Sequence, residues 1–523
     1  MTNRLVIAPP SGSRRTPTAY TLENPEVPIY DNRETPEPTF GADVSVREVS
    51  MTLNNGAKVD LRGYFESVII EESMFNMKVS GSVIINDLVG ALEKFEIRGG
   101  EKLNLKIYKP ESEDILIWRE DFIINKVNKH EVNVTTGSGK YQLMFTSNSF
   151  VRSIKKTIFK SFKDISLLNA VRNLYSEMSS NDLMIEDPQI TLSDSFICTG
   201  IPPHVAIDAL AQRASGPLKY YVFFERFVPV TGQYINGQPF SGSHYFGSVE
   251  QLINSTDENG IKVLTFGKKT DANVEAPNII RVSKLVKESN FNRLESTLLG
   301  LHKTKFTYLD LKNRSATNKT ISYADQNFFK DVSGDFYSNS FLTSDNRFFQ
   351  NSSSEIGTRK LTTTKNFGNK KKEDWLPYNI FGMLTKNYLK LSAVVQGGTN
   401  SISVGNIVQL NVISYFEKMA SASSGTPPLD EIYSGRYYVT GVTHVITQEK
   451  YQKTLEISRG SSRKEFYTEA STLIRKLEST YPNLAKLFID KETKYGNTYF
   501  LFRICNDERL SCNGTCREAN SLQ

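Results

Sequence analysis

The sequence predicts a mainly β protein with a small α/β module, an extended N-terminal arm and a helical C-terminal tail. Three observations predict this class: apolar residues alternate with period two over most of the chain, helical spacing is confined to short stretches, and prolines crowd the N-terminus. At about 150 residues per domain, 523 residues correspond to three or four folded units. With 39% hydrophobic and 23% charged residues, the composition is that of a globular protein rather than a disordered, collagen-like or coiled-coil one.

The N-terminal arm, residues 1–42, is predicted to be extended. Seven of the 19 prolines lie in it, and each proline removes a backbone hydrogen-bond donor and fixes φ. They are Pro9, Pro10, Pro17, Pro25, Pro28, Pro36 and Pro38. The sequence leaves two interpretations open, an arm that wraps a partner and a plain disordered tail.

A run of strands is predicted between residues 44 and 150. Apolar residues alternate with polar or smaller ones in four stretches, as in strands with one buried face. The stretches are Val49–Leu53, Met77–Ile85, Leu103–Ile107 and Tyr141–Phe145, and the turn sequences between them are Asn54-Asn55-Gly56, Arg98-Gly99-Gly100 and Thr136-Gly137-Ser138-Gly139. About six strands without a helical interruption favour a small antiparallel barrel or sandwich, since closing a sheet removes its exposed edges.

An α/β module follows. Helical spacing predicts a helix over 161–178, with Ser161 or Asp164 as N-cap. A second helix is predicted from Pro202-Pro203 to Ala214, because proline is tolerated in a first helical turn. A strand at Tyr220–Glu225 comes directly after it.

The remaining chain is predicted to return to strands and then to end in a helix. Strands are expected at Lys262–Phe266, Ile279–Val286 and Ser296–Asp310. Residues 313–372 are rich in Ser, Thr and Asn and are predicted to be long loops with aromatic anchors. The last strands expected are Lys390–Val395, Asn406–Ile413, Arg436–Val445 and Lys453–Ser458. Residues 464–489 carry an apolar stripe at helical spacing.

Charge and hydropathy exclude several classes of protein. The net charge of +6 is a small difference between 63 basic and 57 acidic side chains, so we expect no binding to nucleic acid through bulk charge. The apolar run near the N-terminus, Leu5–Ala8, is far shorter than a membrane helix. We therefore expect no signal peptide and no membrane span.

Histidine chemistry is sparse. The five histidines lie far apart and form no metal-binding pattern, so each is predicted to be a surface residue of a strand or helix. They are His130, His204, His244, His302 and His444. The sequence contains no Gly-rich phosphate-binding loop and no Gly-X-Ser-X-Gly motif. We expect no catalytic residues and no cofactor.

Two charged features have a structural explanation. Consecutive strand residues point to opposite faces, so Glu71 and Glu72 cannot act on one bond, and we predict solvated carboxylates. A basic stretch at residues 152–163 has no interleaved aromatic residues beyond Phe159 and Phe162, which favours a solvated face. Its cations are Arg152, Lys155, Lys156, Lys160 and Lys163.

Cys505, Cys512 and Cys516 form the one unusual cluster. Three sulfurs near a terminus are weak candidates for a metal site that takes a fourth ligand from elsewhere, but the spacing fits neither zinc knuckles nor the usual iron–sulfur runs. Reduced thiols or a local disulfide are favoured over a metal. We therefore predict no metal site.

Three stretches of the chain combine strands and turns in a distinctive order. The first comprises Ile201–Ala214, Tyr221–Glu225 and His244–Leu252, the second is Gly300–Asp310, and the third comprises Val404–Leu410, Ser434–His444 and Tyr451–Arg459. In the third, a Gly precedes an apolar strand, a Ser-Gly-aromatic strand ends in His, and a Tyr-X-X-Thr strand ends in Arg. Together they resemble the baseplate hub proteins of contractile-tailed bacteriophages, a family shared with type VI secretion spike hubs, over about residues 44–463.

The resemblance implies a fold with two tube-type antiparallel β-barrel domains and the α/β module between or beside them. The domains expected are a Pro-rich extended arm (1–42), a first barrel (43–155), the module (156–260), a second barrel (261–463) with long loops at about 313–385, and a helical tail with the Cys cluster (464–523). The arm and tail depart from the family pattern, and we hypothesise that both contact neighbouring baseplate or spike subunits.

The resemblance also implies a function. Such hubs are homotrimers, and two barrels per chain give six barrels around the axis, which adapts the sixfold tail tube to the threefold central spike and leaves a channel for DNA. The implied partners are the spike, tail tube or tube-initiator proteins and baseplate wedge proteins, and the implied location is the tail baseplate of the virion. We expect no enzyme activity and no sequence-specific nucleic-acid binding. The alternatives are a spike hub of a type VI secretion or phage-derived injection machine and, less favoured, a cell-wall-degrading tail enzyme.

Overall fold

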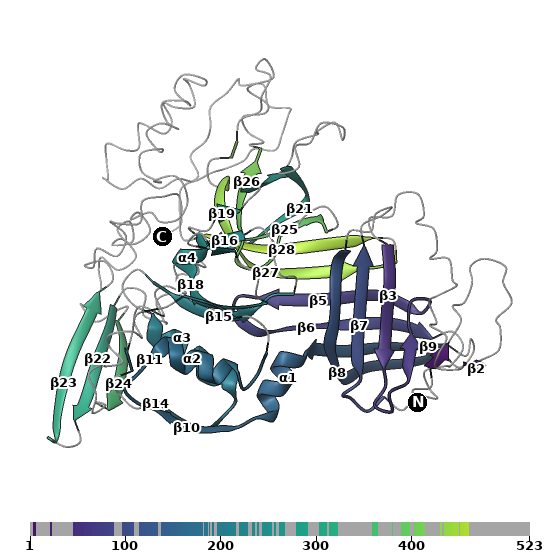
Figure 1. Ribbon diagram of the computed structural model, residues 1–523. Helices are drawn as coiled ribbons and strands as arrows, with labels where there is room; N and C mark the ends of the chain where they lie inside the picture. The colour runs from purple at the N-terminus through teal and green to yellow at the C-terminus, as the bar shows by residue number, and fades with distance from the viewer. Residues whose placement is uncertain are drawn as a thin grey trace, which may run out of the picture. The chain divides into compact units, whose positions relative to one another are not determined.

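The computed structural model (Figure 1) describes part of the chain. The described residues are 4–6, 21–23, 45–87, 97–108, 115–133, 138–180, 183–186, 188, 191–192, 196–215, 219–227, 233–235, 238–239, 243–253, 256–257, 261–266, 279–290, 303–310, 313–322, 358–364, 379, 389–397, 402–413, 429–430, 433–448 and 450–459. Two units divide the chain, Met1–Arg463 and Lys464–Gln523, and all described residues belong to the first. The predicted helix at 464–489, the Cys cluster at 505–516 and most of the arm lie outside them.

The region predicted as the first barrel, and called the first barrel below, is a seven-stranded antiparallel sheet in the order β4-β3-β7-β8-β9-β6-β5. Among the described residues no pairing between β4 and β5 closes this sheet. Its strands are β3 (Ser45–Thr52), β4 (Lys58–Asp60), β5 (Phe65–Ser73), β6 (Asn76–Asp87), β7 (Lys102–Tyr108), β8 (Ile115–Asn133) and β9 (Ser138–Ser147). In Figure 1, β3, β7 and β8 cross over β5 and β6. Alternate residues from all these strands fill one apolar core, as the period-two pattern predicts.

Two short strands of the arm extend this sheet beyond β4. They are β1 (Arg4–Val6), which runs parallel to β4, and β2 (Thr21–Glu23), which is antiparallel to β1. Part of the predicted extended arm is therefore strand.

The second barrel is a closed ring of six strands in the order β27-β26-β20-β21-β25-β28, because β28 also pairs with β27. The strands are β20 (Lys262–Phe266), β21 (Ile279–Asn290), β25 (Leu389–Gln396), β26 (Ile407–Val412), β27 (Gly435–Ile446) and β28 (Tyr451–Arg459). All but β21 match the predicted strands to within two residues at each end; β21 runs four residues further. β20 differs from the antiparallel expectation, since it runs parallel to both β21 and β26. Parallel neighbours need crossover connections, which alternation along a strand does not reveal.

β27 joins the two barrels into one continuous sheet. Its first half pairs with β26, and its second half, Gly441–Ile446, pairs with β5 of the first barrel. The change of partner coincides with a register shift against β28 between Val439 and Gly441.

The α/β module has its own apolar core. Its helices are α1 (Asn148–Lys155), α2 (Leu167–Tyr175), α3 (Pro203–Ala214) and α4 (Val249–Ile253), and its strands are β10 (Ile158–Phe162), β11 (Ile165–Ser166), β12 (Leu183–Ile185), β13 (Thr191–Leu192), β14 (Phe196–Ile201), β15 (Tyr221–Glu225) and β18 (His244–Ser248). The predictions of α3 and β15 are confirmed.

The predicted helix at 161–178 is wrong at its start. Ser166 is the N-cap of α2, and its hydroxyl accepts the Asn169 amide at 3.2 Å. Residues 158–162 instead form β10, which pairs with β14 and buries Ile158 and Phe162. This long-range pairing outweighs the local helical spacing.

The predicted long loops at 313–372 are also corrected in part. Residues Ser315–Ser322 (β23) and Thr358–Thr364 (β24) flank β22 (Lys303–Asp310) in a three-stranded sheet. Thr is β-branched and favours strands, and the partner strand supplies the backbone hydrogen bonds. A second small sheet contains β16 (Gln233–Ile235), β17 (Gln238–Pro239) and β19 (Thr256–Asp257).

No helix in the described part of the chain has the length and apolar composition needed to span a membrane.

Candidate functional site: a buried polar junction

Buried charge concentrates where the two barrels and the module meet. Glu225, Arg226 and Phe227 follow directly on the buried apolar residues of β15, so the chain carries two charged side chains into the interior. Glu225 is 1% exposed and Arg226 is fully buried. Because burying a charge is costly, partners must offset it.

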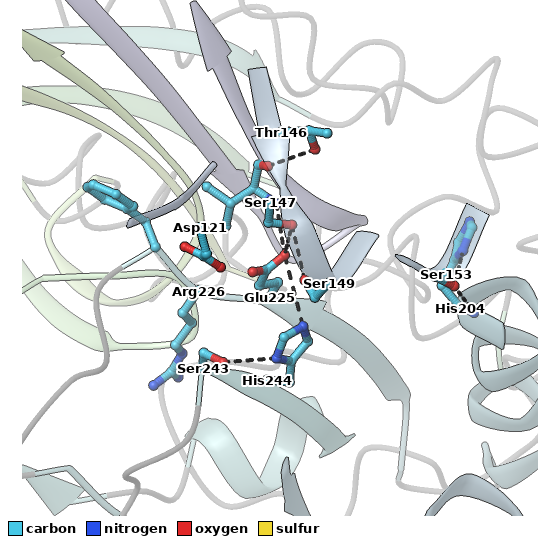
Figure 2. Close-up of polar contacts among 12 residues, drawn as sticks. Asp121, Thr146, Ser147, Ser149, Ser153, His204, Glu225, Arg226, Ser243 and His244 are labelled. Carbon is cyan, nitrogen blue, oxygen red and sulfur yellow. Dashed lines mark hydrogen bonds and ion pairs between the residues drawn. The ribbon is translucent and has the colours of Figure 1, made fainter. Parts of the chain in front are cut away.

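Glu225 ties the module to three strands of the first barrel, and Figure 2 shows its contact with Ser147. One carboxylate oxygen accepts the Ser147 hydroxyl of β9 at 2.5 Å and the Val79 amide of β6 at 3.3 Å. The other accepts the Arg119 guanidinium of β8 at 3.2 Å. All three of these hydrogen bonds therefore connect Glu225 to the first barrel.

Arg119 connects the same elements from the barrel side. Its guanidinium donates to both oxygens of Asp121, at 2.7 and 3.2 Å, and to the Phe227 carbonyl at 2.9 Å. Burial opposes the charge on Arg119, but Glu225 and Asp121 outweigh it and raise the pKa of the guanidinium. Arg119 is thus a nearly buried side chain that keeps its charge.

Glu72 joins all three parts. This residue of β5 accepts the Phe227 amide at 2.8 Å and the Ser403 hydroxyl at 3.0 Å, and Ser403 lies just before β26. Its third partner is His444 of β27, whose Nε2 lies 3.2 Å from the carboxylate. His444 Nδ1 in turn lies 2.8 Å from the Tyr451 hydroxyl of β28.

The pKa directions fix the protonation of this chain of contacts. Burial opposes ionisation of Glu72, but His444, the Phe227 amide and Ser403 outweigh it and lower the pKa of Glu72. Burial lowers the pKa of His444 despite the neighbouring carboxylate. A neutral His444 therefore donates from Nε2 to ionised Glu72 and accepts the Tyr451 hydroxyl at Nδ1.

Two further buried cations surround Glu72. Burial lowers the pKa of Lys453 to about 8 and of Arg226 to about 9, and the charge of Glu72 opposes both shifts. Lys453 Nζ also donates to the Ile402 carbonyl at 3.2 Å. The carboxylate of Glu72 is thus the counter-charge for cations contributed by β28 and by the residue after β15.

His244 lies beside Glu225 but is held by other groups. Its Nδ1 is 3.0 Å from the Tyr175 hydroxyl and 2.9 Å from the Ser243 hydroxyl. Nε2 is 3.9 Å from Glu225, which is too long for a hydrogen bond. Burial lowers the pKa of His244, so the ring is neutral near pH 7.

The junction holds parts together rather than presenting reactive groups. Ser147, Glu225 and His244 contain the residue types of a hydrolase triad, but Glu225 lies between the other two and His244 is not hydrogen-bonded to Ser147 or Glu225. All three are at most 1% exposed, so a substrate could not reach them. The geometry of this cluster fits a structural joint.

The structure corrects several sequence-based expectations for polar residues. His204, His244 and His444 are buried, not on the surface. The hydroxyl groups of Ser153, Tyr175, Ser243 and Tyr451 contact the Nδ1 atoms of these rings, and the carboxylate of Glu72 contacts Nε2 of His444. Nε2 of His244 has no hydrogen-bond partner among the described residues. The side chains of His130 and His302 lie outside the described set.

The prediction that Glu71 and Glu72 point to opposite faces is confirmed, but the prediction that both are solvated is wrong. Glu71 is exposed, but Glu72 is 2% exposed. The five cations of the basic stretch are exposed, as predicted.

No group of three His, Cys, Asp or Glu residues in the described ranges is arranged to hold a metal. The weak candidates Cys505, Cys512 and Cys516 lie outside those ranges and stay untested. Sequence reasoning missed Glu72, Glu225 and Arg119 as a set. The one local signal was a Glu-Arg pair directly after an apolar strand.

Solved structures that are similar to this chain include two tail proteins and a secretion-system component. The tail protein from Neisseria meningitidis MC58 is 12% identical, with a TM-score of 0.44, over 80% of this chain and 98% of that one. The 43 kDa tail protein of prophage MuSo2 from Shewanella oneidensis is 10% identical, with a TM-score of 0.45, over 79% and 98%. The E. coli c3393 protein, a component of the type VI secretion system, is 8% identical, with a TM-score of 0.37, over 80% and 77%. No family model and no curated protein sequence matches this chain.

Proposed function

We propose that this protein is the structural baseplate hub of a contractile phage tail. In this proposal three copies form a ring of six barrels that adapts the sixfold tail tube to the threefold spike and leaves a channel for DNA. The proposal keeps the domain boundaries given above and places the protein in the tail baseplate of the virion. Its proposed partners are the spike, the tail tube or tube initiator, and wedge proteins.

One observation carries the proposal: in a single chain, a closed six-stranded barrel and a seven-stranded sheet are joined to each other. The β27–β5 ladder makes their sheets continuous, and Glu72 and Glu225 bind both barrels and the module through buried hydrogen bonds. A hub that presents two equivalent barrels per copy needs this, since independently moving barrels would not form a regular sixfold ring.

The three stretches that resemble hub proteins support the same conclusion. The third stretch folds into β26, β27 and β28, which are adjacent strands of the closed barrel. The first stretch folds into α3, β15, β18 and α4, and the Glu225 that ends β15 anchors the junction. Glu225 and His444 of the resembling stretches thus lie in the joint.

The test is the mass of the purified protein in solution. Light scattering should give three times 59.1 kDa at micromolar concentration. A stable monomer would contradict the proposal. A particle reconstruction that places the chain on the threefold axis between tube and spike would distinguish a phage hub from an injection-machine hub by the particle it belongs to. Clearing of peptidoglycan by the protein would instead favour a tail enzyme.

A further inference from the structure

A surface of the module remains unexplained by the junction. Four large apolar side chains are exposed there: Phe159 (77%), Ile197 (58%), Ile154 (53%) and Val205 (39%). Three exposed cations, Arg152, Lys155 and Lys163, flank Ile154 and Phe159 in the sequence. We call these seven residues the cationic–apolar patch. Apolar residues gathered on a surface and rimmed by charge are typical of protein–protein contact sites.

The strand half of the patch is held by the β10–β14 ladder. Phe159 pairs with Thr199 and Ser161 pairs with Ile197, so Phe159 and Ile197 are diagonal neighbours on the outward face. The ring of Phe159 lies over Gly200, where a Cβ would approach Cζ to 3.0 Å. Gly200 has φ +70°, so the backbone also favours glycine there. An exposed aromatic ring is therefore held in a defined position.

The helix half of the patch is held by a side-chain contact. Ser153 of α1 and His204 of α3 lie 2.8 Å apart (Figure 2), and they are the immediate neighbours of Ile154 and Val205. The pairing of Ile158 with Ile201 connects this half to the strand half. The two pairs of exposed apolar side chains are thus carried by adjoining elements of the module.

The cations of the patch differ from their neighbours. Lys156 and Lys160 pair with Glu177, at 3.2 and 2.7 Å. Arg152, Lys155 and Lys163 have no acidic partner among the described residues. Their charge is available to an acidic surface.

A complementary surface lies on the outside of the second barrel and β5. Its exposed carboxylates are Glu71, Glu288 and Glu456, and its exposed apolar residues are Val286 (39%) and Phe75 (43%). We call these five residues the acidic–apolar face.

The ladders place these residues on one side of a continuous sheet. Val286 pairs with Ser392, Ser392 with Glu456, Glu456 with Gly441, and Gly441 with Ser73 beside the turn that holds Phe75. Burial, together with Glu288 and Glu71, raises the pKa of Glu456, although Lys390 opposes the rise. The carboxylates therefore repel one another in the single chain.

We propose that the cationic–apolar patch of one copy docks on the acidic–apolar face of the next copy. This inference rests on the proposed trimeric ring and specifies the contact between neighbouring copies in it. Two unlike but complementary surfaces on one chain give a head-to-tail interface, which is what a cyclic ring requires. Phe159 supplies an aromatic anchor, and the opposite charges set orientation and exclude wrong pairings.

Charge reversal and its compensation test the contact. The Lys155→Glu/Lys163→Glu variant should weaken trimer formation at least tenfold, measured by light scattering over a dilution series. Adding Glu288→Lys and Glu456→Lys in the same chain should restore the trimer. Lys102→Glu is the matched control, since Lys102 is an exposed lysine of β7 outside both surfaces and should leave the mass unchanged.

The outcomes separate this inference from the proposed function. If wild type is a trimer and the Lys155→Glu/Lys163→Glu variant forms the trimer equally well, the docking contact is overturned and the proposed ring stands. A wild-type monomer overturns both. A trimer that persists while the variant loses binding to duplex DNA assigns the patch to nucleic acid and also overturns the contact. All four substituted side chains are exposed, so unfolding curves matching wild type verify that each variant folds.

Discussion

Glu225 and Glu72 are both buried carboxylates that join separate parts of the fold, but different donors hold them. A permanent cation, Arg119, binds Glu225 directly. Neutral donors bind Glu72: the His444 ring, the Ser403 hydroxyl and the Phe227 amide. The cation near Glu72 with the lowest pKa, Lys453, can release its proton. The difference predicts that the joint at Glu225 tolerates loss of its carboxylate less well than the joint at Glu72.

Of the changes considered, removing the carboxylate of Glu225 should lower the stability of the fold the most. Glu225→Ala leaves the nearly buried Arg119 with only the more exposed Asp121 as its carboxylate partner, and it removes the acceptor of the Ser147 hydroxyl and the Val79 amide. We expect a loss of about 3–5 kcal/mol in the free energy of unfolding, measured by urea denaturation. Glu66→Ala is the control, since Glu66 forms a half-exposed pair with Lys140 and should cost less than about 1 kcal/mol. Equal losses in the two variants would contradict the role of Glu225.

Neutral isosteres sharpen the comparison. Glu72→Gln keeps one acceptor oxygen, so either the Phe227 amide or the His444 ring loses its acceptor, while Lys453 can compensate for the lost charge by releasing its proton. We expect a cost of about 1.5–3 kcal/mol. Glu225→Gln should cost more, because Arg119 stays charged and keeps only the more exposed Asp121 as its counter-charge. The measurement is the urea midpoint of both variants at pH 7. The comparison fails if Glu72→Gln is the more destabilising of the two.

The pH dependence of stability should reveal the buried Lys453. Its pKa is lowered from 10.5 to about 8 in the folded protein, so between these values the unfolded chain binds more protons. Stability should rise with pH in this window by up to about 1.4 kcal/mol per pH unit from this group alone. Lys453→Met should lack the rise. The measurement is the free energy of unfolding of both proteins in urea from pH 7.5 to 10. Subtracting the values of the variant from those of wild type cancels the contributions of other groups. If the two free energies depend on pH in the same way, the lowered pKa of Lys453 is refuted.

The two buried Tyr–His contacts should differ slightly in their contribution to the stability of the fold. Tyr451→Phe leaves His444 Nδ1 without its hydroxyl partner and should cost about 1 kcal/mol. Tyr175→Phe should cost less, because the Ser243 hydroxyl also lies within 2.9 Å of His244 Nδ1. Thermal unfolding of the two variants side by side resolves the order. A larger loss for Tyr175→Phe would show that Ser243 does not substitute.

Local patterns predicted the strands well and the pairings poorly. Alternation located β25, β26, β27 and β28 to within two residues at each end, because one face of each strand is buried. The same pattern cannot show that β20 runs parallel to its neighbours or that β27 changes partner at Gly441. It also gave a helix where β10 pairs with β14.

The candidate site was harder to predict than the fold. Glu72 was expected in water because a carboxylate is usually exposed, and only partners 155, 331 and 372 residues away make its burial tolerable. No local window contains those partners. The same holds for Glu225, whose partner Arg119 is 106 residues distant.

The sequence by itself determined the β-rich class, most strand positions, the Pro-opened helix α3 and the opposite orientation of Glu71 and Glu72, since these follow from side-chain periodicity and backbone preference. Tertiary structure alone decided that the second barrel closes, that β27 continues into the first barrel, and that carboxylates and histidines are buried at the junction. These depend on contacts between residues far apart in the chain. Partners that are distant in the sequence offset the cost of removing these charges from water.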